Sequence, residues 1–148
     1  HDGLRMHPFR HAIAHAAIPS GHRLAKKTEI TPEDMAGEPF IALPRRFHQR
    51  NVYDRIFAER GIHREIKVET ATSIAICELV RSGIGLGLVN PFPVGQCQFE
   101  GVEFRRFTPR VDYLTQFFMP SGKVTPIAQR FIEHARRTVP ADAYSHPA

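Results

Sequence analysis

Hydrophobic residues recur along the chain with two different periods, and each change of period marks a predicted element. Alternation of polar and apolar residues over positions 11–18 indicates a strand, because successive strand side chains point to opposite faces. Over positions 47–60 apolar residues lie three or four apart, which predicts one buried stripe on a helix, formed by Val52, Tyr53, Ile56 and Phe57. The same criteria predict strands at 39–43, 66–69, 84–89, 102–107 and 112–119, and helices at 72–83 and 126–138.

Residue types at the ends of these segments support the predicted helices. Thr31, followed by Pro32 and two acidic residues, is typical of a helix start, so we expect a short helix that ends at Gly37. Gly61 and Gly83 are expected to end the two central helices. Strands that alternate with helices of this length predict an α/β fold with a mainly parallel sheet.

Length and composition indicate a globular domain. The chain has 148 residues, of which 42% are hydrophobic and 24% charged, so it can bury a core of its own. We expect fraying only at the ends, above all over residues 140–148. The two cysteines exclude a disulfide-rich secreted fold, and no apolar run is long enough to span a membrane.

The charge balance adds little evidence for a nucleic-acid-binding surface. The net charge is +5 and the pI about 9.7, but the basic residues are dispersed along the chain rather than gathered in one run. The chain starts at His1 and shows no secretory leader, so we expect a cytoplasmic protein. We also expect that the chain begins inside a longer gene product.

No catalytic, metal or cofactor site is predicted. His7, His11 and His15 lie four apart, which would align metal ligands on a helix but not on the strand expected here. Cys77 and Cys97 have no evident base to activate them, and the nucleophile, phosphate-loop and zinc-protease motifs are absent from the sequence. The glycines of residues 83–87 follow a helix and enter a strand, which is the reverse of a dinucleotide-binding motif, so we expect them to permit close packing.

Three turns at the carboxyl ends of predicted strands are the candidate ligand site. In open α/β sheets ligands bind outside this edge. The first turn carries the hydroxyl groups of Thr70, Thr72 and Ser73 at a helix start, where unpaired N–H groups and the helix dipole favour a carboxylate, although a simple helix cap explains one of them.

The other two turns offer charge and an apolar wall. Arg45 and Arg46 are able to hold a carboxylate, or to be two solvated arginines. Asn90, Pro91 and Phe92 offer an amide contact and an apolar wall, or simply end a strand. We expect the three turns to converge on one cleft.

Several segments of residues 17–92 resemble the effector-binding domain of LysR-type transcriptional regulators. The resemblance rests on their order and spacing rather than on one motif. It is carried by residues 18–25 (IPSGHRLA), 30–41 (ITPEDMAGEPFI), 69–72 (ETAT) and 79–91 (LVRSGIGLGLVNP). Arg23 and Met35 depart mildly from the family pattern, which usually has proline and leucine there.

The resemblance implies a two-lobed α/β fold similar to type 2 periplasmic binding proteins. This chain would hold one complete lobe and part of the other: residues 1–18 as part of lobe I and the first crossover strand, 19–110 as lobe II, and 111–148 as the second crossover strand and the C-terminal helix of lobe I. The rest of lobe I would lie upstream, together with a winged helix-turn-helix.

The same resemblance implies a small-molecule effector between the lobes and no enzymatic activity. Its contacts in lobe II would be the residues that the three turns supply: Thr70, Thr72, Ser73, Asn90, Pro91, Phe92 and one of Arg45 and Arg46. Residues 89–92 (VNPF) resemble regulators of lysine and opine metabolism, which implies an amino-acid-like or carboxylate effector.

Effector binding would change the angle between the lobes and re-space the DNA-binding heads of a homodimer or homotetramer. A solute-binding protein of a transport system with the same two-lobed fold is the main alternative. An enzyme on a similar fold is the second, and its only candidate thiols are Cys77 and Cys97.

Overall fold

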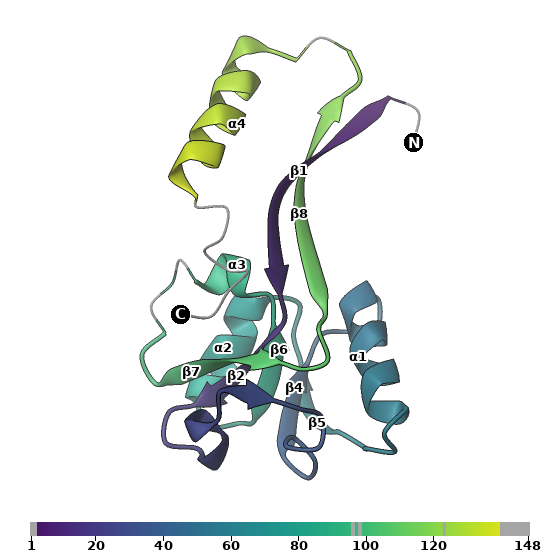
Figure 1. Cartoon of the computed structure of the whole chain (residues 1–148), viewed down its shortest axis with the longest axis vertical. Coiled ribbons are helices and arrows are strands. Elements are labelled where there is room, and N and C mark those ends of the chain that lie inside the picture. The colour runs from purple at the N-terminus through teal and green to yellow at the C-terminus, as the bar shows by residue number, and fades with distance from the viewer. Residues whose placement is uncertain (1–2, 96, 98, 123, 140–148) are drawn as a thin grey trace.

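The computed structural model describes residues 3–95, 97, 99–122 and 124–139. It consists of a six-stranded sheet flanked by helices and a long two-stranded ribbon that projects from it (Figure 1). Helix α4 (Pro126–Thr138) lies beside the far end of the ribbon. The predicted α/β class is therefore confirmed, and the fraying expected for residues 140–148 falls outside the described residues.

Strand order in the larger sheet is β3-β7-β2-β6-β4-β5. Its strands are β2 (His15–Pro19), β3 (Glu29–Ile30), β4 (Pro39–Ala42), β5 (Glu65–Glu69), β6 (Leu86–Val89) and β7 (Val102–Phe107). Strand β4 pairs in parallel with β5 and β6, and β3 pairs in parallel with β7. Strand β2 runs antiparallel to both of its neighbours, β6 and β7. The sheet is therefore mixed at its centre, whereas the sequence predicted a mainly parallel sheet.

Each face of this sheet buries one apolar cluster under a helix. Helix α1 (His48–Ala58) contributes Tyr53 and Phe57 to the cluster that also holds Ala16 and Ile18 of β2. Helix α2 (Ser73–Arg81) covers the opposite face, where its side chains meet Ala17 and β6. Neighbouring residues of β2 thus enter different clusters, as the alternation in the sequence predicts.

Close packing explains the glycines that precede and enter β6. A Cβ atom on Gly85 would lie 2.3 Å from the carbonyl oxygen of Pro39, and one on Gly87 would lie 2.3 Å from Cγ2 of Ile76. Both distances are far below a van der Waals contact, so the neighbouring strand and helix approach the backbone as closely as they do only because no side chain intervenes. The predicted packing role is therefore confirmed for Gly85 and Gly87. Gly83 has open space beside it and a φ of 76°, so it serves the turn after α2 instead.

The ribbon pairs β1 (Leu4–Ile13) with β8 (Asp112–Pro120) in antiparallel register. The single strand predicted over residues 11–18 is wrong, because it is divided at Ala14 between the ribbon and the larger sheet. Ala14 belongs to neither strand: its N–H donates to Val111 O at 2.8 Å, just before β8, and its carbonyl accepts from Phe107 N at 3.0 Å, at the end of β7. These long-range hydrogen bonds place the division between β1 and β2 at Ala14.

The helix predicted over residues 31–37 is also wrong, since the segment is a series of turns. Its backbone N–H groups bond three residues back, as Met35 N does to Pro32 O at 3.1 Å, and the carboxylate of Asp34 accepts from Thr31 N at 3.0 Å. Gly37 ends the segment before an i to i−4 ladder develops. Two short helices were not predicted, the 3-10 helix η1 (Arg23–Lys26) and α3 (Pro91–Val94).

Candidate functional site

Two of the three predicted turns are joined by a direct hydrogen bond. Strand β5 is followed by the start of α2, and β6 is followed by α3, so both turns lie at the carboxyl ends of parallel strands. The hydroxyl oxygen of Ser73, at the first position of α2, accepts from the backbone N–H of Asn90 at 3.1 Å. The structure therefore brings Ser73 and Asn90 together, as the sequence predicts.

The other hydroxyl residues of the first turn fix its backbone. Thr72 is the N-cap of α2, and its Oγ1 accepts from Ala75 N at 3.1 Å. Thr70 N donates to the carbonyl of Ala42 at 2.9 Å, which extends the β4–β5 pairing into the turn. This bond confirms that Thr72 is a helix cap. A contact between the same hydroxyl group and a ligand stays a prediction.

Hydrogen-bonding capacity remains at this turn for an external acceptor. Thr72 and Ser73 each use an oxygen lone pair within the protein, and a hydroxyl group that accepts still carries a hydrogen to donate. Among the described residues, the Asn90 side chain bonds through its amide oxygen, which accepts from Phe92 N at 3.0 Å. Its NH₂ group adds amide donors at the same place. Hydroxyl and amide donors at a helix N-terminus suit a carboxylate.

Phe92 connects this turn to the ribbon. Its ring meets the ring of Phe9 on β1 edge to face, with 5.9 Å between the centroids and an interplanar angle of 89°. Pro91 is buried at the start of α3. Phe9 thus packs beside Phe92, a contact that sequence analysis missed because these residues are far apart in sequence. The role of Pro91 and Phe92 as the apolar wall of a ligand site stays a prediction.

The two arginines of the third turn lie on the β5 side of the same edge. Arg45 is exposed and lines a hollow of about 310 Å³ along β5, together with Arg50, Ile66, Lys67, Val68 and Glu69. The guanidinium of Arg46 stacks over Phe47 at 5.1 Å from the ring centroid. Glu69 directly precedes Thr70, so Arg45 is near the first turn, and its part in ligand binding stays a prediction.

A buried ionic network that sequence analysis missed holds the third turn in place. Arg50 of α1 is 3% exposed and donates to Leu43 O at 2.7 Å and to Glu69 Oε1 at 2.5 Å. Its Nε contacts both carboxylate oxygens of Asp54, which also pairs with Arg64. Because Arg50 joins Leu43, the residue after β4, to Glu69, the last residue of β5, it fixes the spacing of the turns that follow these strands.

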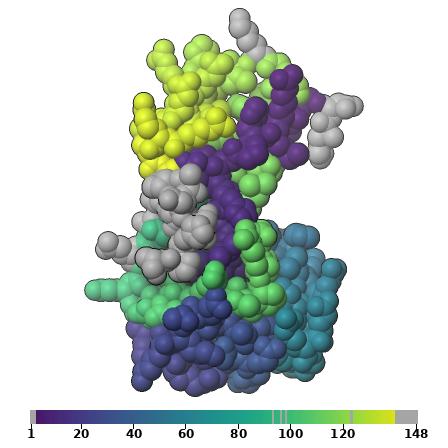
Figure 2. All heavy atoms as spheres, viewed as in Figure 1, coloured from purple at the N-terminus to yellow at the C-terminus, as the bar shows by residue number. Residues whose placement is uncertain are grey.

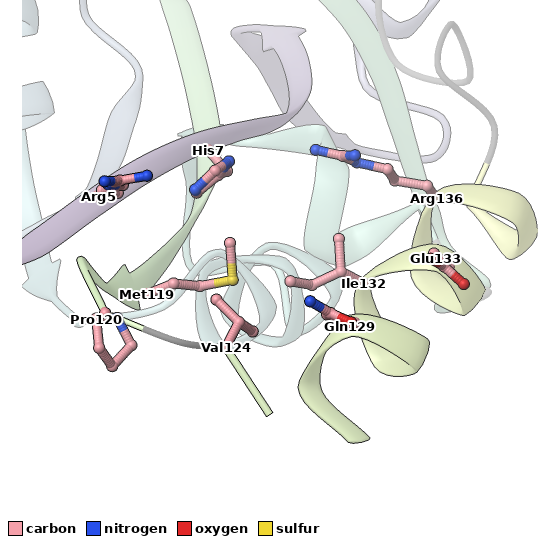
Figure 3. A pocket seen from close by; sticks show the side chains of 10 residues that line it. Arg5, His7, Met119, Pro120, Val124, Gln129, Ile132, Glu133 and Arg136 are labelled. Carbon is pink, nitrogen blue, oxygen red and sulfur yellow. The ribbon is translucent and has the colours of Figure 1, made fainter. Parts of the chain in front are cut away.

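A separate hollow of about 480 Å³ lies between α4 and the ribbon (Figure 3). It is lined by Arg5 and His7 of β1 and by Gln129, Ile132 and Glu133 of α4. Other large apolar side chains of the ribbon and α4 are exposed without lining the hollow: Leu4 and Met6 on β1, Phe118 on β8, and Ile127 and Phe131 on α4. Several exposed large apolar side chains on neighbouring elements are typical of a surface that packs against further protein.

Groups for other chemistry are not gathered in the described part of the chain. No cluster of three or more His, Cys, Asp or Glu residues that could hold a metal ion occurs there. Burial raises the pKa of the Cys77 thiol to about 12, so this thiol is un-ionised at neutral pH. None of the helices in that part is long and apolar enough to cross a membrane.

Comparison with known proteins identifies the family. The family described as LysR substrate binding domain matches residues 1–140. The transcriptional activator protein LysR of Escherichia coli is 32% identical over 124 residues, which are 83% of this chain and 40% of that protein. The chain thus spans about two fifths of the length of this curated relative.

Solved structures show the same fold. HinK, a LysR family transcriptional regulator from Pseudomonas aeruginosa, superposes with a TM-score of 0.73 at 22% identity, covering 93% of this chain and 48% of that one. The effector-binding domain of QuiR in complex with shikimate gives a TM-score of 0.69 at 19% identity, covering 97% and 68%. These neighbours have the two-lobed fold similar to periplasmic binding proteins, as the sequence predicts.

LysR-type proteins are transcription regulators rather than enzymes or transport proteins. The resemblance to the LysR family that the sequence predicts is therefore confirmed at the level of the domain. The chain belongs to the LysR family and is its substrate-binding, or effector-binding, domain.

Proposed function

We propose that the chain senses a small ligand bearing a carboxylate, bound at the turn where Ser73 and Asn90 meet. That hydrogen bond carries the proposal, because it joins the start of α2 to the start of α3 and gathers donors from both. The carboxylate accepts from the hydroxyl groups of Thr72 and Ser73 and from the amide of Asn90, and Thr70 shapes the turn. Phe92 and Pro91 form the apolar side of the site.

The cationic side of the site is supplied by the third turn. Arg45 and Arg46 lie in the turn after β4, and Arg50 with its carboxylate partners holds the start of this turn to the end of β5. Guanidinium groups at this edge add long-range attraction for an anion and discriminate against a neutral ligand. An amino-acid-like ligand, such as a basic amino acid or an opine, is the class we favour.

We assign the larger sheet with its helices to lobe II, for which the sequence predicts residues 19–110. Its central strand β2 (His15–Pro19) adds residues 15–18 to this lobe. The ribbon of β1 and β8 and helix α4 are then the crossover strands and the part of lobe I that this chain contains. Figure 2 shows α4 and the outer part of β1 standing well above the larger part of the molecule. The exposed Leu4, Met6, Phe118, Ile127 and Phe131 support this division, because further strands and helices of lobe I would cover them.

Ligand binding between two lobes acts by shifting a population. A ligand that contacts both lobes binds the closed arrangement more tightly, and its differential affinity sets how far the equilibrium moves. In a cytoplasmic homodimer or homotetramer with an N-terminal winged helix-turn-helix, such a shift would re-space the DNA-binding heads and regulate transcription. No covalent step or cofactor is required of the residues described above.

Calorimetric titration with a matched pair of ligands tests the proposal. L-lysine and cadaverine carry the same side-chain amine, but cadaverine lacks the carboxylate. We expect L-lysine to bind and cadaverine to bind at least tenfold more weakly, and Ser73→Ala to reduce the affinity for L-lysine by about fivefold, the loss of one hydrogen bond. Hexanoate in the same titration separates a carboxylate ligand in general from an amino acid.

Equal binding of L-lysine and cadaverine, or unchanged binding to a folded Ser73→Ala variant, would refute the carboxylate site. If L-lysine does not bind while hexanoate does, the ligand class is wrong and the site stands. Gel-shift analysis of the longer protein with and without the ligand that binds then tests the regulatory step.

A further inference from the structure

A bulge in β1 places one aromatic side chain against two other elements. Pro8 pairs with Gln116 and Arg10 with Thr115, so the intervening Phe9 has no partner in the ribbon. Its ring lies 5.9 Å from that of Phe92 on α3 and 4.6 Å from that of Phe117 on β8, measured between centroids. The bulge therefore puts Phe9 between the candidate ligand turn and the ribbon.

The contacts that join α4 to the ribbon involve residues that also touch Phe9. Phe117 meets Phe131 of α4 with 6.1 Å between ring centroids. Arg10 has its guanidinium 4.3 Å from the Phe9 ring centroid and donates to the carbonyls of Arg136, at 2.8 Å, and Val139 at the C-terminal end of α4. A cation that binds these carbonyls also complements the helix dipole.

These contacts form a continuous path from the ligand turn to α4. Ser73 bonds to Asn90, Asn90 caps α3, and Phe92 of α3 packs against Phe9. From Phe9 the path divides into Phe117 with Phe131 and Arg10 with the end of α4. Edge-to-face rings hold their relative orientation, so a movement of α3 either carries Phe9 with it or breaks the contact.

We propose that Phe9 is a positioning residue that couples the turn at Ser73 and Asn90 to α4, so that the two move together. The ligand that triggers the movement rests on the proposed function, whereas the coupling between Phe92 and α4 is a property of this chain alone. Helix α4 thereby registers whether the ligand turn is displaced.

Hydrogen exchange of the α4 amides in the 148-residue chain tests the coupling without a ligand. We expect Phe92→Ala to speed exchange over residues 126–138 by about threefold to tenfold, the loss expected for one aromatic pair. Phe9→Ala should give a similar increase, and the double variant should exchange no faster than Phe9→Ala. In a Phe9→Trp background, which keeps an aromatic ring at this position, Phe92→Ala should again speed exchange in α4.

Phe118→Ala is the matched control, because Phe118 is on β8 next to Phe117 but is 63% exposed. It should leave exchange in α4 within about twofold of the unsubstituted chain, the effect of an exposed substitution. Unchanged α4 exchange in Phe92→Ala, or independent additive effects of Phe92→Ala and Phe9→Ala, would overturn the coupling. An effect of Phe118→Ala as large as that of Phe9→Ala would also overturn it.

A second arm uses L-lysine as the probe and measures binding and exchange in the same samples. The two proteins are compared at the same fraction of bound L-lysine. The change in α4 exchange that binding causes should be at least threefold smaller in Phe9→Ala than in the unsubstituted chain. An equal change in both proteins contradicts the coupling. If L-lysine does not bind, the proposed ligand is wrong, and the exchange data on the variants still decide the coupling.

Discussion

The phenol groups of Tyr53 and Tyr113 share a hydrogen bond of 2.7 Å between α1 and β8. The two side chains are 3% and 8% exposed, and they lie in the same apolar cluster. The bond therefore ties the main helix of the larger sheet to the base of the ribbon. Neither residue reveals this in the sequence, because 60 positions separate them.

Replacing one member of the tyrosine pair should destabilise the fold more than replacing both. Tyr53→Phe leaves the Tyr113 hydroxyl buried without its partner, so we expect the free energy of unfolding to fall by about 1–2 kcal/mol. The double variant should recover part of this loss, because no polar atom is then stranded. Urea unfolding of the three variants measures the coupling, and purely additive losses would contradict it.

The same pair should resist ionisation while the chain is folded. Burial raises the pKa of Tyr113 to about 12, and burial with the adjacent Tyr113 raises the pKa of Tyr53 well above its usual value. The neutral phenols are favoured by folding, so their contribution to stability is complete below about pH 10 and is lost as the pH rises toward 12.

Tyrosinate absorbance in a Tyr144→Phe variant isolates this pair, because the sequence contains three tyrosines. We expect no ionisation below about pH 11 and then a step that coincides with the loss of near-ultraviolet circular dichroism. A step near pH 10 in a chain that is still folded would show that the hydroxyls are solvated.

Thr72→Ala should weaken both α2 and ligand binding. Loss of the N-cap bond to Ala75 lowers the free energy of unfolding by about 1 kcal/mol. We expect a comparable loss in binding free energy, about fivefold in affinity, from the missing hydroxyl contact. Thr125→Ala is the matched control, because it removes the equivalent cap bond to Ala128 on α4. Thr125→Ala should lower the free energy of unfolding by a similar amount. The ligand affinity measured by calorimetry should stay unchanged.

Gly85→Ala should be among the most destabilising small substitutions in the chain. The added methyl group would meet backbone atoms of Pro39 at 2.3 Å and 2.7 Å, and two neighbouring strands cannot both keep their register around it. We expect a loss of about 2–3 kcal/mol in unfolding free energy, the cost of overpacking a core. Gly122→Ala adds its methyl to open space and should change stability by less than about 0.5 kcal/mol, measured by the same denaturation.

The two thiols should differ sharply in reactivity. Cys77 is buried, and burial raises the pKa of its thiol to about 12, whereas Cys97 is exposed. A Cys97→Ser variant should therefore be inert to a disulfide reagent at pH 8 until denaturant is added. Modification of Cys77 in the folded variant at the rate of a free thiol would contradict its burial, and circular dichroism before the assay checks that the variant is folded.

Local patterns predicted much of the secondary structure and part of the candidate site. Apolar spacing located α1, α2 and α4, and hydroxyl residues after a strand marked the turn that contains Thr72 and Ser73. These predictions succeed because helix period, capping and turn chemistry depend on neighbouring residues. The helix predicted at Thr31 was wrong because the Asp34 side chain and Gly37 favour turns over so short a segment.

Other features required pairing between distant parts of the chain. The bulge at Phe9, the buried position of Arg50 between two strand ends and the break at Ala14 all depend on which strands lie together and in what register. From the sequence alone, an arginine in a polar stretch is expected at the surface. Arg50 is buried because α1 packs over β4 and β5, where its guanidinium joins the ends of the two strands.

Local periodicity and turn chemistry are enough to predict an α/β domain with hydroxyl and amide groups after its parallel strands, because both depend on neighbouring residues. The bond between Ser73 and Asn90, and the place of Phe9 between Phe92 and Phe117, follow from the folded arrangement alone. Hydrogen bonds and ring contacts act over only a few ångströms. Which residues come that close is fixed by strand order and register rather than by separation along the chain.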